Sequence, residues 1–90
     1  MSVGLTMARH ELDPDSRIPK YRQLAEILRG QIEAGEFPPD RALPSKRVLT
    51  QQYGVSTRTV DDATALLKAE GLIEAVIGKG LYVIPPEERP

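Results

Sequence analysis

Apolar side chains recur at helical spacing in three stretches of the chain, and two short β-rich runs follow them. The first stretch begins at Pro19, whose fixed φ suits the first turn of a helix, and ends before Gly35. The apolar stripe of this helix consists of Tyr21, Leu24, Ala25, Leu28 and Ile32. Charged residues fall off the stripe, so we predict an amphipathic surface helix.

Two further helices are predicted on either side of a glycine turn. Ser45 caps a helix that runs to about residue 53, and Gly54 makes the turn. Ser56 caps the third helix, which Gly71 ends. The inner side of the second helix is expected to consist of Val48, Leu49 and Gln52, and the buried stripe of the third of Val60, Ala63, Leu66 and Leu67.

The last part of the ordered chain carries a hairpin signal. Residues 72–77 and 81–84 are rich in β-forming side chains, and Gly78 and Gly80 lie between them. A short extended piece is expected around Ala42 and Leu43. The order is helix, short strand, helix, tight turn, helix and hairpin. This order predicts a mainly α winged helix-turn-helix with a two- to three-stranded antiparallel sheet.

Neither end of the chain shows this periodicity. Residues 1–17 contain turn-forming residues, and we expect them to form a flexible arm. Residues 86–90 are polar and rich in proline, and we expect a flexible tail. The predicted domain therefore comprises residues 18–85.

Composition narrows the classes of function. The 90 residues include 12 basic and 13 acidic side chains, for a net charge of −1, so attraction to nucleic acid must come from a local patch. The chain has no cysteine, which excludes disulfides, thiolate metal sites and cysteine nucleophiles. His10 stands alone in the arm, so no metal, cofactor or enzyme activity is expected. The apolar runs are too short for a membrane span, and a cytoplasmic protein is predicted.

Several short pieces lie in the order and at the spacing of a known family. They are Pro19 with Tyr21, Pro38-Pro39, Leu43-Pro44-Ser45 with Arg47 and Leu49, Gly54-Val55-Ser56, Thr59-Val60, Ala63, Leu66-Leu67, Glu70-Gly71-Leu72 and Gly78 through Val83. Through these pieces, residues 19–84 resemble the N-terminal DNA-binding domain of the GntR family of bacterial transcription regulators. The resemblance implies sequence-specific binding to double-stranded DNA.

The third helix, at about residues 57–70, is the expected recognition helix, which would enter the major groove. Ser56 at its cap, with Thr57, Arg58 and Thr59 in its first turn, places hydroxyls and a guanidinium at the positive end of the helix dipole. Arg58 can contact a guanine edge with two hydrogen bonds, or a phosphate. The alternative is that Ser56 and Thr59 only cap the helix and Arg58 is a solvated charge.

The second helix and the hairpin loop supply further candidates. The resemblance implies that Arg47 contacts DNA, with Ser45 and Lys46 beside it, although the family usually has an acid where Lys46 stands. The loop of residues 77–80 is the expected wing tip, where Gly78 and Gly80 allow close approach to the DNA backbone. Lys79 can enter the minor groove or pair with a phosphate. The alternative is an ordinary hairpin turn with a solvated lysine.

Asp61 and Asp62 depart from the family, in which arginine is common at one or both positions. A carboxylate beside DNA phosphates weakens attraction, and three explanations remain open. The acids accept hydrogen bonds from cytosine, they pair with Arg58 or Lys68, or they face a basic protein partner. The last would make the chain a winged-helix module for protein-protein contact.

The resemblance also bears on partners. Regulators of the GntR family normally carry a C-terminal domain that binds a small effector and dimerises, whereas few residues follow Ile84 here. We therefore expect a stand-alone domain without a small-molecule effector, and a monomer or a weak dimer that forms on DNA. The resemblance implies an inverted-repeat operator, and a location on the nucleoid when the protein is bound.

Overall fold

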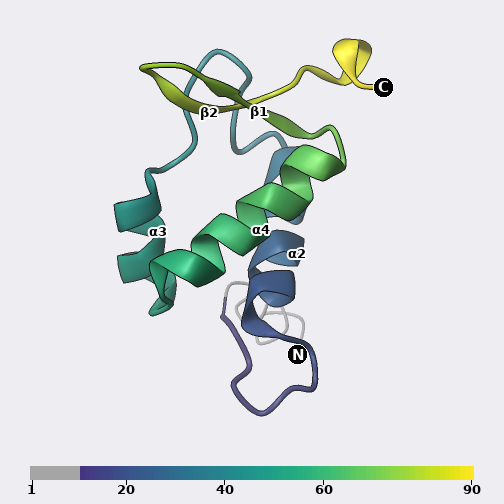
Figure 1. The fold of residues 1–90 in the computed structure, drawn as a ribbon. Coiled ribbons are helices and arrows are strands. Elements are labelled where there is room, and N and C mark those ends of the chain that lie inside the picture. Colours follow the sequence, from purple (N-terminus) through teal and green to yellow (C-terminus); the bar gives the residue numbers. More distant parts are fainter. Residues whose placement is uncertain (1–10) are drawn as a thin grey trace.

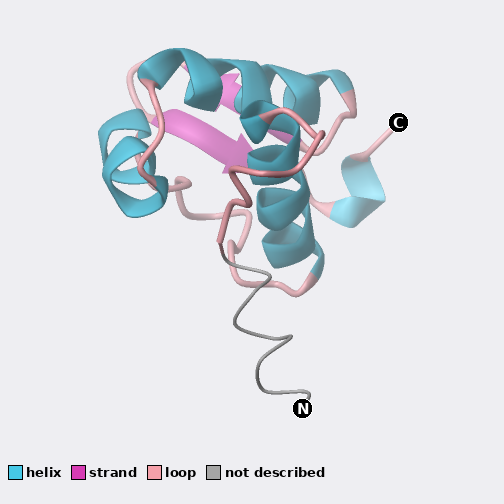
Figure 2. Cartoon of the chain, turned by 90° about the horizontal axis from the view of Figure 1, so that it is seen from below, coloured by secondary structure: helices cyan, strands magenta, loops and turns pink. Residues whose placement is uncertain are grey.

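The computed structural model of the protein describes residues 11–90. The elements in this part of the chain are α2 (Lys20–Glu33), α3 (Lys46–Tyr53), α4 (Thr57–Ala69), β1 (Ile73–Val76), β2 (Gly80–Val83) and the 3₁₀ turn η1 (Pro86–Glu88). Helix α4 runs through the middle of the molecule, packed against both α2 and α3, and α3 lies beside its N-terminal half (Figure 1). The hairpin β1–β2 has the helices on one side only (Figure 2).

The predicted caps of α3 and α4 are confirmed. The Ser45 hydroxyl oxygen accepts a hydrogen bond from the Val48 amide at 3.2 Å, and the Ser56 oxygen accepts one from the Thr59 amide at 3.1 Å. Between the two helices, Gly54 adopts a left-handed conformation with φ 64°, which ends α3 and lets the chain reverse. These local features fix where α3 begins and ends and where α4 begins.

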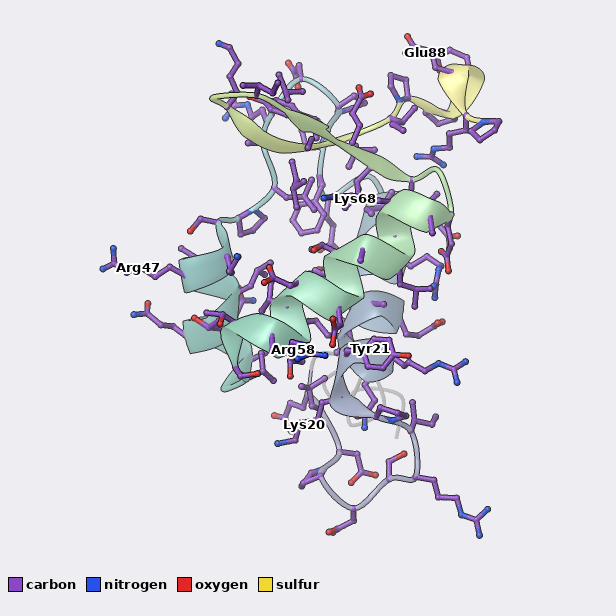
Figure 3. The ribbon with its side chains drawn as sticks, viewed as in Figure 1. Lys20, Tyr21, Arg47, Arg58, Lys68 and Glu88 are labelled. Carbon is purple, nitrogen blue, oxygen red and sulfur yellow. The ribbon has the colours of Figure 1, made fainter. Side chains whose placement is uncertain are left out.

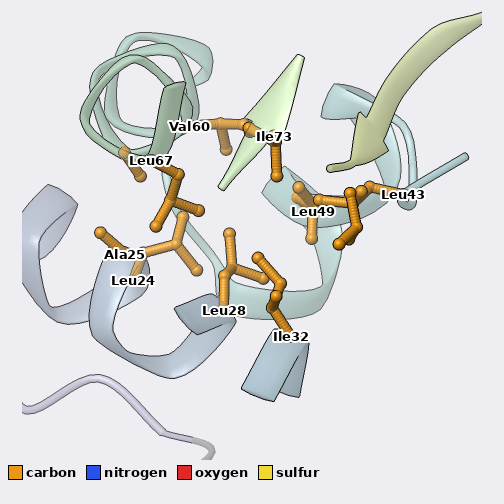
Figure 4. Close-up of a cluster of buried hydrophobic side chains, with 11 residues drawn as sticks. Leu24, Ala25, Leu28, Ile32, Leu43, Leu49, Val60, Leu67 and Ile73 are labelled. Carbon is orange, nitrogen blue, oxygen red and sulfur yellow. The ribbon is translucent and has the colours of Figure 1, made fainter. Parts of the chain in front are cut away.

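A single core joins the three helices and the hairpin (Figure 4). It contains most of the predicted stripes of α2 and α4, with Tyr21 and Leu66 only partly buried, together with one residue of α3, one from each strand and Leu43 before α3. The buried apolar side chains are Leu24, Ala25, Leu28, Ile32, Leu43, Leu49, Val60, Ala63, Leu67, Ile73 and Val83. Because α4 contributes to this core along its length, its outer face is held in a fixed orientation.

The sheet is a two-stranded antiparallel hairpin in which Ile73 pairs with Val83 and Val76 with Gly80. The extended piece before α3 adds a single bridge from Ala42 to Tyr82, and the Leu43 amide donates to the Leu81 carbonyl at 2.8 Å. The predicted fold class, a mainly α winged helix-turn-helix, is confirmed, with the third strand reduced to this bridge.

The prediction for the inner side of α3 was partly wrong. Val48 is 46% exposed and Gln52 is exposed, so Leu49 alone carries the burial of this helix. Helix α3 has only eight residues and meets the rest of the fold along one narrow side. A short helix of this kind needs only one buried anchor.

At both ends of the predicted domain, residues 18–85, the structure has contacts between the domain and the segment outside it. At the N-terminal side, Leu12 packs against the core, and the Gln23 side chain accepts from the Asp13 amide at 2.7 Å and donates to the Asp13 carbonyl at 3.0 Å. At the C-terminal side, Arg89 Nε donates to the Ile84 carbonyl at 2.8 Å. Residues 11–17 and 86–90 thus touch the domain, while residues 1–10, His10 included, lie outside the described residues.

Candidate nucleic-acid interface

The N-terminal end of α3 and the N-terminal half of α4 lie on the same side of the molecule, and they carry most of the predicted site residues (Figure 3). A salt bridge joins the two helices, with Lys46 Nζ at the start of α3 lying 2.8 Å from Asp61 Oδ1 in the second turn of α4. The N-terminal end of each helix has a further property. Each end also carries the positive pole of its helix and backbone N–H groups without an intrahelical acceptor. This surface is therefore suited to anions despite the acidic side chains within it.

The first turn of α4 presents Thr57 and Arg58 to solvent, and the Arg58 side chain is 85% exposed. Arg58 Nε lies 3.3 Å from Asp62 Oδ2, one helical turn further along. This contact uses the inner nitrogen of the guanidinium. Neither terminal nitrogen forms a hydrogen bond with the residues that the structure describes, so a two-pronged contact with a base or phosphate remains available to them.

Ser56 and Thr59 are engaged with each other. Besides accepting from the Thr59 amide, the Ser56 hydroxyl donates to Thr59 Oγ1 at 3.1 Å. Both side chains therefore form the cap of α4, which agrees with the alternative that Ser56 and Thr59 only cap this helix. What this end of the helix still offers to an anion is the N–H groups that the cap leaves unsatisfied.

Helix α3 contributes two cations that differ in their surroundings. Arg47 is exposed and points away from the body of the protein (Figure 3). Its guanidinium forms no salt bridge within residues 11–90. Lys46, in contrast, is held by Asp61, with both side chains about half exposed (51% and 53%). Arg47 is thus the more accessible of the two charges.

The hairpin turn lies in residues 77–79, because Gly80 already begins β2. The Lys79 amide donates to the Val76 carbonyl at 2.9 Å, and Gly78 has φ 79°, a conformation that favours glycine at this turn position. Lys79 is exposed, and Ile77 beside it is 99% exposed. The turn therefore places one cation and one bare apolar side chain at the tip of the hairpin.

Sequence reasoning identified one of the two acid partners correctly. Asp62 pairs with Arg58, as the spacing of four residues on one helix allows. Asp61 pairs with Lys46 of the neighbouring helix, whereas Lys68 forms no salt bridge with any described residue. The Lys46–Asp61 contact has no signal in the sequence, since it depends on the angle between α3 and α4.

A second ion-pair group lies on the other side of α4. Arg29 of α2 donates from Nε and a terminal nitrogen to the Glu70 carboxylate at 2.9 and 2.7 Å, and it also pairs with Glu26. The hydrogen bond with Glu70 raises the pKa of Arg29 above its usual value, against the opposing effect of burial. The pair fastens α2 to the C-terminal end of α4, and we did not predict it.

Other kinds of site find little support in residues 11–90. A shallow hollow of about 470 Å³ between α2 and α4 includes Tyr21, Leu66 and the Arg29–Glu70 pair, and none of the predicted site residues. Within the same residues, His, Asp and Glu side chains form no group of three that could bind a metal ion. The described helices are also too short or too polar to cross a membrane.

Two capped helices around a glycine turn, followed by a hairpin with an exposed basic tip, define a winged helix-turn-helix protein. Comparison with known proteins gives the family. The model of the family described as "Bacterial regulatory proteins, gntR family" matches residues 20–83 of this chain. The chain belongs to this family, as the resemblance of its motifs implied.

Individual relatives agree with this assignment. The chain is 41% identical over 76 residues to the HTH-type transcriptional repressor NagR of Bacillus subtilis, covering 84% of this chain and 31% of NagR. It is 42% identical to the mannosyl-D-glycerate transport/metabolism system repressor MngR of Escherichia coli, covering 79% of this chain and 29% of MngR. A crystal structure of AraR(DBD) in complex with operator ORR3 superimposes with a TM-score of 0.72 and 36% identity, covering 81% of this chain and 88% of that one.

Proposed function

We propose that this chain is the DNA-binding part of a transcription regulator and binds double-stranded DNA in a sequence-specific way. The observation that carries the proposal is the likeness, in sequence and fold together, to a DNA-binding domain whose structure holds its operator. The repressors NagR and MngR support the same role. The chain spans about a third of their length, so regulation by the whole protein is part of the proposal.

In this proposal α4 enters the major groove with its N-terminal end first. Arg58 reads a base, because its terminal nitrogens form no hydrogen bond with the described residues while Asp62 holds the inner one. Thr57 lies beside Arg58, and the cap formed by Ser56 and Thr59 leaves the other N–H groups of the first turn available to a phosphate. Asp62 thereby acts as a positioning residue for Arg58.

Helix α3 and the wing hold the DNA backbone on either side. Ser45, Lys46 and Arg47 lie at the N-terminal end of α3, where a phosphate is favoured by the helix dipole and by both cations. At the wing, Gly78, Lys79 and Gly80 approach the adjacent minor groove, and Lys79 supplies the charge. Asp61 lies inside this surface next to Lys46.

The alternative of a protein-protein module gains no support. The relatives found are transcription regulators.

We further propose that two copies bind an inverted repeat, with each α4 in one half-site. Dimerisation of this part is expected to be weak and to occur on DNA. The proposed place of action is the cytoplasm, on the nucleoid.

Titration of a fluorescent duplex pool of random sequence, followed by selection of the bound sequences, tests the proposal. We expect saturable binding at low salt whose affinity falls with a log-log slope of about −0.9 for each phosphate contacted. We also expect the selected sequences to share one motif with two-fold symmetry. Absence of binding at low salt, or a selected pool without a motif, would contradict sequence-specific recognition.

A further inference from the structure

We propose that Asp61 widens the margin between specific and nonspecific DNA binding by holding the Lys46 ammonium until a correctly placed phosphate replaces it. The inference rests on the proposed function and deepens it. It starts from a 2.8 Å salt bridge that links Lys46 Nζ, at the start of α3, to Asp61 Oδ1, in the second turn of α4.

The Lys46–Asp61 salt bridge can be broken easily, so that a phosphate replaces the carboxylate as the partner of Lys46. Its two side chains are 51% and 53% exposed, and it consists of a single contact in the protein as described. Ion pairs this exposed contribute little to stability, so breaking one has a small cost. A lysine ammonium is a compact charge on a flexible stem and can turn from a carboxylate to a phosphate without moving the backbone.

The exchange differs between the two kinds of complex. In a specific complex, base contacts fix the register, so a phosphate is held at the end of α3, where Lys46 can take it. In a nonspecific complex no base contact fixes a phosphate there, whereas the Asp61 carboxylate is always present. Lys46 then stays with Asp61 and releases no counterion from the DNA. Nonspecific affinity, which depends almost wholly on such releases, is lowered by one contact.

The location of the acid supports this role over a purely structural one. Both helix ends are already fixed by the serine caps and by buried Leu49 and Val60, so the pair is not needed to position α3 against α4. Asp62, the neighbouring acid, uses its carboxylate on Arg58 instead. Among the acids of residues 11–90, Asp61 is the one that forms a salt bridge between the two helices proposed to face the DNA.

The test compares Asp61→Asn with the wild type on two probes, a random-sequence duplex pool and the duplex recovered by selection. On the random pool we expect Asp61→Asn to bind about three- to tenfold more tightly, with a salt slope steeper by about 0.9, the value of one added phosphate contact. On the selected duplex we expect an unchanged slope, because Lys46 already contacts phosphate there.

Two controls make the outcome decisive. In a Lys46→Gln background, Asp61→Asn should lose its effect on the salt slope. Glu33→Gln, which removes the same charge from exposed α2, should change affinity for the random pool by much less than Asp61→Asn. Thermal melting by circular dichroism checks that every variant folds.

Equal gains in both backgrounds would overturn the inference, because the effect would then be one of net charge. Weaker binding by Asp61→Asn would overturn it by showing that the carboxylate makes a contact with the DNA. These results leave the proposed function intact. If the wild type binds no duplex at low salt, the proposed function fails first and the inference with it.

Discussion

The two ends of α4 carry ion pairs of the same chemistry in different settings. At the C-terminal end, Glu70 takes two nitrogens of Arg29 at 2.9 and 2.7 Å, and the Arg29 side chain is only 23% exposed. At the N-terminal end, Asp61 and Asp62 each make one contact, with Lys46 and Arg58, whose side chains are 51% and 85% exposed. A covered two-point contact fixes helices, whereas an exposed single contact can be given up to a ligand.

The difference indicates how one helix serves two purposes. Its C-terminal half is fastened to α2 and lies next to the hairpin, and supplies stability. Its N-terminal half is anchored by Val60 on the side that faces the core, whereas the side that faces solvent is charged and accessible. Substitutions at the two ends should therefore affect different measurements, which the following predictions use.

The largest effect is expected from Leu67→Ala, which removes a fully buried side chain of α4. The lost apolar contacts and the resulting cavity should lower the free energy of unfolding by about 2–5 kcal/mol. Urea denaturation followed by circular dichroism measures this loss. Leu66→Ala is the matched control, since Leu66 is only partly buried and should cost less. A loss below about 1 kcal/mol for Leu67→Ala would contradict the described core.

Arg58→Ala should affect binding and leave stability nearly unchanged. The loss of one two-pronged base contact is expected to weaken binding to the selected duplex by about 1–3 kcal/mol and to relax the preference at one base position. Arg22→Ala, which removes the same charge from exposed α2, is the control and should preserve the preference. An unchanged preferred sequence in Arg58→Ala would remove Arg58 as a base reader.

Arg29→Ala should show the reverse pattern. Without the two-point contact to Glu70, the free energy of unfolding should fall by about 1–2 kcal/mol, a value between those of exposed pairs and charged hydrogen bonds. Affinity for the selected duplex, measured on fully folded protein, should not change. Arg29→Lys keeps the charge without the fork geometry and is expected to recover only part of the loss. Reduced affinity with unchanged stability would show that the two ends of α4 are not divided in this way.

Local features of the fold could be predicted from the sequence. The caps at Ser45 and Ser56 and the turn at Gly54 depend only on residues close by in the chain, and the structure has them where expected. The pairing of Arg58 with Asp62 is local in the same sense, since four residues make one helical turn.

Contacts between helices could not be predicted in this way. The Lys46–Asp61 and Arg29–Glu70 pairs join residues 15 and 41 positions apart, and they form only because α4 packs against α3 and α2 at particular angles. The exposure of Val48 has the same origin, because apolar character alone does not tell how much of a short helix is covered. The acid at position 61 therefore looked out of place in the sequence and has a partner in the structure.

The most direct test of the account is amide chemical-shift mapping of the ¹⁵N-labelled protein during titration with the selected duplex. We predict that the largest changes fall on residues 45–47, 56–59 and 77–80, while α2 and the C-terminal half of α4 change little. Changes concentrated on α2 and around the hollow at Leu66, with the N-terminal ends of α3 and α4 unaffected, would contradict the claim that these ends form the reading surface.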